Sequence, residues 1–451
     1  MSKQARHMHL GAFLFGVGHH VSAWRYPDTE AAGILDPSFY ERFAQTAERG
    51  KFDMLFLADS LALLGRSPAH TVSVRPEPIT LLSYLAGVTS RIGLAATVST
   101  TYHEPYNLAR EFATLDHLSG GRAAWNVVTS SRNEEAANFS QERHPEHAVR
   151  YARAKEFIKA AAALWDSWED DAIIADRASG QFAHPDKVHR IDHQGSFFKI
   201  RGPLNAPRPP QGRPVIIQAG ASEAGRLLAA ETAEVVFTAW QTIEEAQLFY
   251  GNVKSLLARF GRTPDQLKIM PGIFPVIGTS EAEAREKEQA LQQLVLPEVG
   301  LSMLSGSLNV DLSGYPLDGP LPELPELEAV NGGKSRFQLV ADMARRDGLT
   351  IRQLIYRVTG ARGHRTIHGT PVQIADQLEA WFTQAACDGF NIMPPYLPGG
   401  LDEFVDQVIP ELQNRGLFRT EYNGTTLREH LGLHRPTSRF SRTSEASSAS
   451  L

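Results

Sequence analysis

Short apolar runs and amphipathic stretches alternate regularly along this chain. Each apolar run of strand length is followed, directly or after an interruption, by residues with apolar positions at helical spacing. After Asp36, for example, Phe39, Phe43 and Ala47 recur every four residues, and Gly50 ends the pattern. The pattern predicts α-helices that alternate with eight β-strands, at residues 10–15, 52–58, 92–98, 123–128, 215–218, 235–238, 269–277 and 390–393.

Almost continuously apolar strands joined by helices are typical of a parallel sheet that is covered on both faces. Eight such units favour an α/β fold of the closed (β/α)8 TIM barrel type over the alternative, an open doubly wound sheet. We expect a single barrel domain over residues 1–434. Two stretches without the regular pattern predict insertions at about residues 170–214 and 296–350. The Ser- and Thr-rich residues 435–451 are expected to be a disordered tail.

Composition narrows the class of protein. The 451 residues are 42% hydrophobic and carry 51 acidic against 45 basic side chains, a net charge of −6. This balance offers no electrostatic footprint for nucleic acid or an anionic membrane surface. No apolar stretch is long enough to cross a bilayer, and the first residues lack a signal core. Cys387 is the only cysteine, which excludes an internal disulfide. Together these features predict a cytoplasmic enzyme.

In a (β/α)8 barrel the binding groups follow the carboxyl ends of the strands. Asp59 and Thr97 lie at the ends of the second and third predicted strands. The fifth strand runs into a turn of small residues before a helix, with Gly220, Ala221, Ser222 and Glu223. Such a turn presents backbone N–H groups and the positive end of the helix dipole to a phosphate group. The alternative is that Ser222 only caps the helix.

Several histidines and one tyrosine are further candidates. His147 and Tyr151 are four residues apart on one predicted helix face and can bind one anionic group together. An exposed polar start of the helix is the alternative, and no metal is expected because a third ligand is missing. His19, His20 and His103 follow the first and third strands and are candidates for an acid or base. The alternative for these three is a place on the rim of the barrel.

Three motifs carry a resemblance to a known family. They cover residues 52–59 (FDMLFLAD), 96–102 (ATVSTTY) and 121–130 (GRAAWNVVTS), with support from residues 215–222, 388–395 and 408–419. The chain resembles the bacterial luciferase-like flavin monooxygenases. Within them it is most similar to the branch of nitrilotriacetate, EDTA and dibenzothiophene-sulfone monooxygenases and pristinamycin IIA synthase. Related long-chain alkane monooxygenases carry a histidine where this chain has Ser131, which argues against alkane hydroxylation that uses this histidine.

The resemblance implies the oxygenase component of a two-component system that binds reduced FMN (FMNH2). Its partners would be a separate NAD(P)H:FMN reductase, O2 and a small organic substrate. A flavin C4a-(hydro)peroxide would oxygenate this substrate, with C–N or C–S cleavage among the outcomes. A homo-oligomer, either a dimer or a tetramer, is also implied. An F420-dependent oxidoreductase and a non-catalytic flavin-binding protein are the alternatives on the same barrel.

The resemblance also implies which residues contact FMN. The phosphate side is assigned to His147, Tyr151 and Ser222, with backbone groups from Gly220, Ala221 and Glu223. Thr97 would lie near the isoalloxazine ring, and Asp59 near the ring or the ribityl chain. Residues 296–350 would form a segment that gates access of the substrate.

Overall fold

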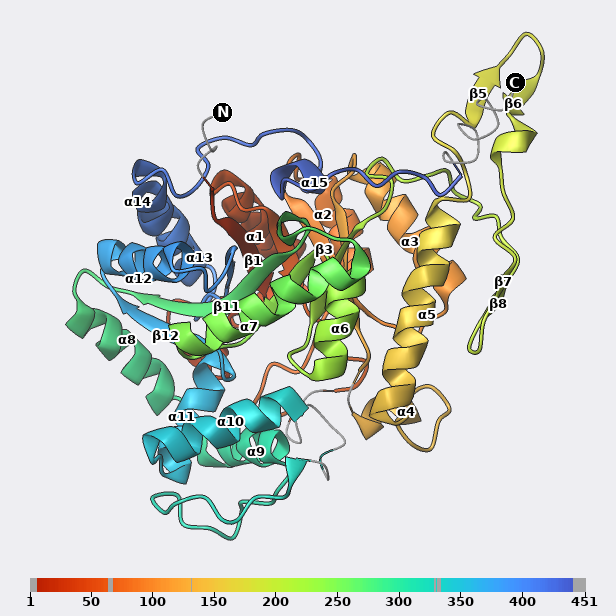
Figure 1. Ribbon diagram of the computed structural model, residues 1–451. Coiled ribbons are helices and arrows are strands. Elements are labelled where there is room, and N and C mark those ends of the chain that lie inside the picture. The colour runs from red at the N-terminus through yellow and green to blue at the C-terminus, as the bar shows by residue number, and fades with distance from the viewer. Residues whose placement is uncertain (1–5, 64–67, 131, 328–329, 331–333, 441–451) are drawn as a thin grey trace.

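Eight parallel strands close into a barrel (Figure 1). The structure, a computed structural model, describes residues 6–63, 68–130, 132–327, 330 and 334–440. Around the ring the order is β10-β9-β4-β3-β2-β1-β13-β11, and β10 also pairs with β11. The predicted (β/α)8 barrel is therefore confirmed, and the open sheet is excluded. The eight strands are those that the apolar runs predict: β1 (His9–Leu14), β2 (Met54–Leu57), β3 (Gly93–Ser99), β4 (Ala123–Val128), β9 (Val215–Ala219), β10 (Val235–Thr238), β11 (Lys268–Ile277) and β13 (Gly389–Ile392).

The first and last barrel strands pair with each other. β1 lies parallel to β13, with His9 opposite Gly389 and Ala12 opposite Ile392. The approach is so close that a Cβ atom on Gly389 would lie 1.9 Å from the carbonyl oxygen of His9. Only glycine fits at this position, because the clash would be with backbone that cannot move aside.

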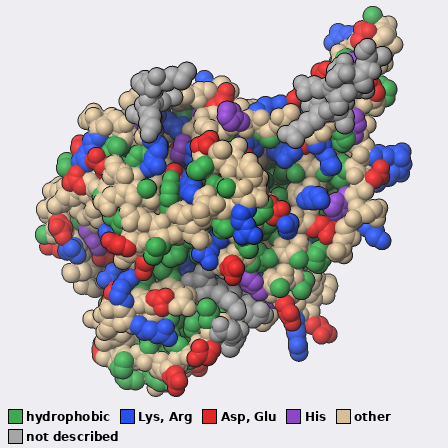
Figure 2. Space-filling model, in the orientation of Figure 1, with side chains coloured by type: hydrophobic (Ala, Val, Ile, Leu, Met, Phe, Trp, Pro, Cys, Tyr) green, Lys and Arg blue, Asp and Glu red, His purple; other side chains and the backbone are tan. Residues whose placement is uncertain are grey.

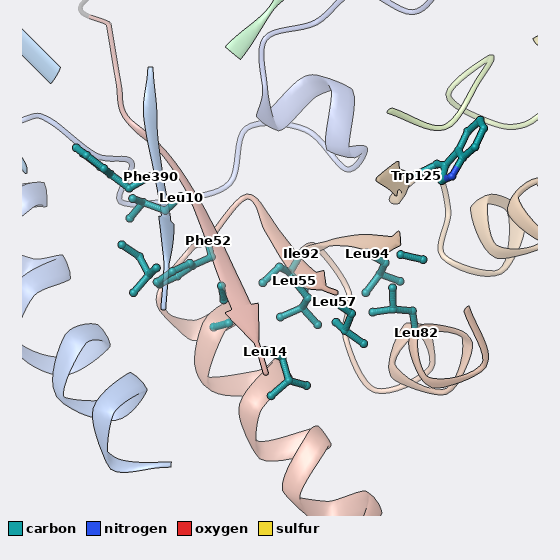
Figure 3. Packing of buried hydrophobic residues seen from close by; sticks show 14 of the residues in the cluster. Leu10, Leu14, Phe52, Leu55, Leu57, Leu82, Ile92, Leu94, Trp125 and Phe390 are labelled. Atoms are coloured by element: carbon teal, nitrogen blue, oxygen red, sulfur yellow. The ribbon is translucent and has the colours of Figure 1, made fainter. Parts of the chain in front are cut away.

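Alternate residues of each strand enter two different cores. Leu55 and Leu57 of β2 belong to the layer between strands and helices, whereas Met54 and Phe56 belong to the barrel interior. This division is the two-residue period of a strand with apolar residues on both faces. Figure 3 shows part of the outer layer, where Leu57 of β2 and Leu94 of β3 lie beside Leu82 of α2.

Helices cover the outside of the ring at nearly the predicted places. Residues 399–414 form a run of three helical segments with a π-helical middle at Phe404–Val408. The helices are α1 (Pro37–Arg49), α2 (Pro78–Ala86), α3 (Pro105–Leu118), α4 (Asn133–Ala137), α5 (His147–Trp165), α6 (Glu223–Thr232), α7 (Ile243–Leu256), α8 (Glu281–Gln293), α12 (Pro371–Thr383), α13 (Gly399–Glu403) and α14 (Ile409–Asn414). α4 and α8 come in addition to the predicted helices.

One strand of the main sheet was not predicted. β12 (Arg365–Gly369) pairs with residues Ile273–Ile277 of β11 and adds a ninth strand to the sheet. β11 is ten residues long, so its second half extends beyond β10 and provides the edge that β12 needs. Three of the five residues of β12 are polar, which hides the strand from an apolar pattern.

The first interruption of the pattern forms an arm. Residues 170–214 contain two antiparallel hairpins, β5 (Ile173–Asp176) with β6 (Gln181–Ala183) and β7 (His193–Gln194) with β8 (Lys199–Ile200). The β5–β6 hairpin projects from the barrel, and its tip stands away from the body of the molecule (Figures 1 and 2). Ile173, Ile174 and Phe182 are exposed on it.

The second interruption forms helices at one end of the barrel. α9 (Pro297–Leu308) and α10 (Lys334–Asp347) pack with α11 (Ile351–Ala361) around a hydrophobic core of their own. Leu304 of α9, Phe337 of α10 and Ile355 of α11 are buried in this core. In Figure 1 the three helices lie below the barrel, at the end opposite the short helix α15 (Leu427–His430). Within the described residues, no helix is long and apolar enough to cross a membrane.

The amino end of the barrel is held by buried charges. Asp53, immediately before β2, is fully buried and accepts hydrogen bonds from Arg419, from His9 and from the amide of Leu10.

Near the C-terminus, Arg435 pairs with Asp170 of the arm. Residues 435–440 of the predicted disordered tail are thus described and in contact with the protein, and residues 441–451 lie outside the described part.

Candidate functional site

A large cavity opens at the carboxyl end of the barrel. Its volume is about 2120 Å³, about twice the upper limit of roughly 1,000 Å³ for usual small-molecule pockets. Ala58, Ser99 and Thr238 mark the strand ends in its lining. Residues from α9 and α10 line it as well, so the second insertion roofs the site. The cavity therefore has room for a large cofactor together with a substrate.

The cavity gathers nearly all of the residues that the sequence predicts for the site. The exception is His103, whose Nε2 lies 2.9 Å from Glu111 Oε2 on the outer helix α3, outside the cavity lining. A role for His103 as acid or base has no geometric support. The predicted residues in the lining are His19, His20, Asp59, Thr97, His147, Tyr151, Gly220, Ala221, Ser222 and Glu223.

The turn between β9 and α6 forms a small cradle. The hydroxyl oxygen of Ser222 accepts a hydrogen bond from the amide of Gly225 at 3.2 Å and so caps α6. A Cβ atom on Gly220 would lie 3.5 Å from the Tyr151 hydroxyl, and one on Gly225 would lie 3.3 Å from it. The two glycines thus leave this hydroxyl a place beside the start of α6. Capping by Ser222 does not exclude phosphate binding, because its hydroxyl proton remains free to donate.

Positive charge and ring contacts complete the cradle. Arg226 follows in the first turn of α6, lines the cavity and has a buried Nε without a hydrogen-bond partner in the described structure. The His147 and Tyr151 rings lie 4.6 Å apart between centroids, on the first two turns of α5. The positive end of the α6 dipole adds to the charge of Arg226. This part of the cavity suits an anion such as a phosphate group.

Asp59 and Thr97 lie at the ends of β2 and β3. The Thr97 hydroxyl donates to the carbonyl of Leu57 at 2.6 Å and accepts from Asn126 Nδ2 at 2.8 Å, so its orientation is fixed. Asp59 accepts a hydrogen bond from the amide of Ser60 at 2.7 Å. Burial raises the pKa of Asp59 above its usual value, and the nearby positive charge of Arg75 limits the rise.

His19 and His20 differ in how their ring nitrogens are used. His19 donates from Nε2 to the carbonyl of Phe13 at 2.8 Å and accepts at Nδ1 from Arg362 at 2.6 Å. His20 accepts at Nδ1 from the amide of Ser22 at 3.2 Å, so its Nε2 carries the proton and is buried without a partner in the described part. Burial lowers the pKa of His20 to about 4, which makes the ring neutral at pH 7.

Sequence reasoning missed the arginines of the site. Arg75, Arg336 and Arg362 line the cavity together with Arg226. Only Arg226 had a usable signal, because it follows Ser222 by four residues in the predicted phosphate turn. The other three come from a loop and from the second insertion, so only the tertiary fold brings them together.

In the described residues no three His, Cys, Asp or Glu side chains are grouped to hold a metal. Ser131, the position of the histidine in the alkane monooxygenases, lies outside the described residues.

The fold and the site define a barrel enzyme with a deep, partly cationic cavity at the carboxyl ends of its strands. A sequence profile described as luciferase-like monooxygenase matches residues 14–388. The chain belongs to the luciferase-like monooxygenase family.

Two relatives and one solved structure indicate the branch. N-acetyl-S-(2-succino)cysteine monooxygenase of Bacillus subtilis (strain 168) is 54% identical over 98% of this chain and 100% of its own length. Nitrilotriacetate monooxygenase component A of Aminobacter aminovorans is 51% identical over 96% of this chain and 97% of its own. The crystal structure of riboflavin lyase (RcaE) with modified FMN and riboflavin is 30% identical and covers 96% of this chain and 97% of its own, with a TM-score of 0.85. The predicted branch is confirmed.

Proposed function

We propose that this protein is the FMNH2-dependent oxygenase component of a two-component monooxygenase that acts in the cytoplasm. A separate NAD(P)H:FMN reductase would supply the reduced flavin, and O2 and a small organic substrate would be the other reactants. The cradle at the start of α6 carries this proposal, because it combines small residues, a helix terminus and Arg226 where a flavin phosphate can bind.

The residues fit FMN in two parts of the cavity. Tyr151, His147 and Ser222 would hold the phosphate, with backbone groups of Gly220, Ala221 and Glu223. The first-turn amides of a helix lack intrahelical partners and are available to such a ligand. Asp59 and Thr97 lie further along the ring, on β2 and β3, where the ribityl chain and the flavin ring would extend.

Reduced flavin supplies the reactivity toward O2, and the protein supplies position and shelter. α9 and α10 roof the cavity and limit its contact with bulk water. The neutral His20 carries its proton on Nε2, which is buried in the wall of the cavity and has no hydrogen-bond partner in the described structure. Fixed donors of this kind stabilise negative charge as it develops on a reactant. The substrates in the names of two relatives, a thioether and a tertiary amine, support cleavage of a C–S or C–N bond as the outcome.

An anaerobic titration with FMNH2 tests the proposal. We expect binding in the micromolar range and weaker binding to Ser222→Ala. Ser222→Asp is the sharper variant, because Asp caps a helix as well as Ser does while its charge repels a phosphate. It should keep the thermal stability of the wild type and lose flavin. Failure of the wild type to bind FMNH2, with equal results for both variants, would refute the proposal. Reduction of F420 by a substrate without oxygen uptake would favour the alternative, an F420-dependent oxidoreductase.

The β5–β6 hairpin supports the proposed homo-oligomer, a dimer or a tetramer. It exposes Ile173, Ile174 and Phe182 at a distance from the barrel, where they contribute nothing to its core. A two-stranded ribbon is marginally stable by itself in water. A second copy of the chain that covers these side chains would stabilise it.

A further inference from the structure

Three arginine side chains form one wall of the cavity, which we call the arginine wall: Arg75, Arg336 and Arg362. The guanidinium carbons of Arg75 and Arg362 lie 3.8 and 3.5 Å from the centroid of the same Phe15 ring. Arg336 of α10 reaches the wall from the roof, with its Nη2 3.4 Å from Nε2 of His364. Aromatic rings and neutral imidazoles thus hold the three cations in place.

Among the described residues no carboxylate forms an ion pair with these three half-buried arginines, and only the more distant charge of Asp59 acts on Arg75. The charges that act on Arg362 are those of Arg75 and Arg336, and both are positive. Nη1 of Arg336 and Nε of Arg362 are buried without hydrogen-bond partners in the described structure. Burial lowers the pKa of Arg75 and of Arg336 to about 10, which reflects the cost of these charges in the protein. Like charges that lie together at a half-buried wall repel one another, so an anion from outside the chain is expected there.

The backbone at Arg362 adopts a conformation that glycine usually occupies. Arg362 ends α11 with a φ of +50°, in the left-handed region. Glycine is usual at this position after a helix, and a larger residue is strained there. Strain of this kind persists where a side chain is needed. The chain places glycine one residue later, at Gly363, and keeps arginine at the strained position.

The arginine wall lies across the ring from the phosphate cradle. The wall is built on Phe15, which follows β1, whereas the cradle follows β9. In the order β9-β4-β3-β2-β1 these two strands are four places apart in an eight-stranded ring, which is the largest separation. An anion at the wall is therefore separate from a phosphate group in the cradle.

We propose that the arginine wall binds the carboxylates of a substrate that carries at least two of them. The inference rests on the proposed function, because it names the substrate class of the same cavity. Asp59 acts on the charge of Arg75, which leaves two arginines without a local anion. A guanidinium presents paired N–H donors that match the two oxygens of a carboxylate. Two such pairs recognise a dicarboxylate and reject its neutral analogue.

Calorimetric titration of the full chain with succinate tests this proposal. Propionate, succinamide and inorganic phosphate serve as the monocarboxylate, the neutral analogue and the competing anion. Succinate should bind at least about 10-fold more tightly than propionate, as expected for one additional charge-assisted pair, and succinamide should not bind. Arg362→Gly suits the left-handed backbone and should fold normally. This variant and Arg336→Gln should each weaken succinate binding by about 10- to 100-fold.

Arg345→Gln is the matched control on α10, because Arg345 is exposed and its side chain lies outside the cavity lining. It should bind succinate like the wild type, and all three variants should retain the FMN affinity of the wild type. Equal binding of succinate and succinamide, or displacement of succinate by phosphate at equal concentration, would overturn the proposal. So would a loss of FMN rather than succinate in Arg336→Gln and Arg362→Gly. If the wild type binds succinate but not FMN, the proposed function fails and the carboxylate site stands.

Discussion

Arg362 donates a hydrogen bond from Nη2 to Nδ1 of His19 at 2.6 Å and joins two segments that are 343 residues apart in sequence. The acceptor nitrogen carries no proton, so His19 is neutral wherever this bond exists. Burial and the adjacent charge of Arg362 lower the pKa of His19 well below its usual value. With both ring nitrogens engaged, His19 is a positioning residue for Arg362.

The first prediction concerns acid stability. His20 and His430 have pKa values of about 4 because they are buried, whereas unfolded histidine titrates near 6.5. Below pH 6.5 these histidines therefore bind protons in the unfolded chain but stay neutral in the folded chain, and the free energy of unfolding falls. For His20 alone the loss between pH 6.5 and 4 is about 3 kcal/mol. Urea unfolding at pH 7 and pH 4.5 measures it.

Two variants separate this effect from other titrations. His20→Gln should reduce the loss of stability at pH 4.5, and His117→Gln, at an exposed site, should not. The carboxyl groups of Asp59 and Asp116 act in the opposite direction, because burial raises their pKa and the folded chain binds their protons first. Equal stability of the wild type at the two pH values would contradict the prediction.

The second prediction concerns the glycines of the cradle. Gly225→Ala places a Cβ atom 3.1 Å from the Ser222 hydroxyl oxygen and 3.3 Å from that of Tyr151. Alanine favours a helix by about 1 kcal/mol over glycine, so the variant should remain folded while its affinity for FMN falls. Gly251→Ala in α7 is the control, because its Cβ atom meets nothing within 4 Å. It should gain stability and bind flavin normally. Flavin titration measures the affinity of both variants for FMN, and thermal unfolding measures their stability.

The third prediction concerns the amino end of the barrel. Burial alone would raise the pKa of Asp53, but Arg419 and His9 lower it to about 2. Asp53→Asn leaves Arg419 without its charge partner and should destabilise the protein by about 3–5 kcal/mol. The contribution of ionised Asp53 to the free energy of unfolding is present above pH 4 and is lost as the pH falls toward 2.

The control for Asp53 is an exposed ion pair. Asp406→Asn breaks the surface pair with Arg49 and should cost at most about 1 kcal/mol. Urea unfolding at pH 7 compares the two variants. The refolded Asp53→Asn protein should bind FMN like the wild type, because Asp53 lies at the end of the barrel opposite the cavity. A loss of flavin affinity without a loss of stability would be the contrary result.

The fourth prediction concerns self-association through the arm. Ile174→Ser and Phe182→Ser together should lower the molar mass measured by light scattering by breaking the contact between copies. Leu248→Ser on α7 is the control, since Leu248 is 77% exposed, more than Phe182 at 64%. It should leave the molar mass unchanged. An unchanged oligomer in the double variant would exclude the hairpin as the contact.

The barrel was predictable because its strands are apolar on both faces. Almost continuous apolar runs such as residues 52–58 are not typical of surface strands. All eight strands that such runs predict form the ring. β12 was not predicted because it pairs only with the extended half of β11, and three of its five residues are polar. Its existence depends on the length of another strand, which is a tertiary property.

The site was predictable where it follows strand ends and where His147 and Tyr151 share one helix face. Asp59, Thr97 and the turn at Ser222 line the cavity because the carboxyl ends of parallel strands meet. His103 also follows a strand but turns outward to Glu111, a choice that local sequence does not reveal. The arginine wall comes from a loop and from insertion helices, whose contacts with β1 no periodicity encodes.

The pairing of β1 with β13 also governs how the protein is made. The ring stays open until Gly389 reaches His9, so a growing chain that has passed the end of β11 at Ile277 carries seven barrel strands with two unpaired edges, β1 and β11, until β13 is made. Contacts between such distant residues form slowly, and unpaired apolar strands aggregate in the meantime. Protein synthesis and folding are therefore coupled at the last strand, and shelter of the incomplete barrel during translation becomes a requirement for its yield.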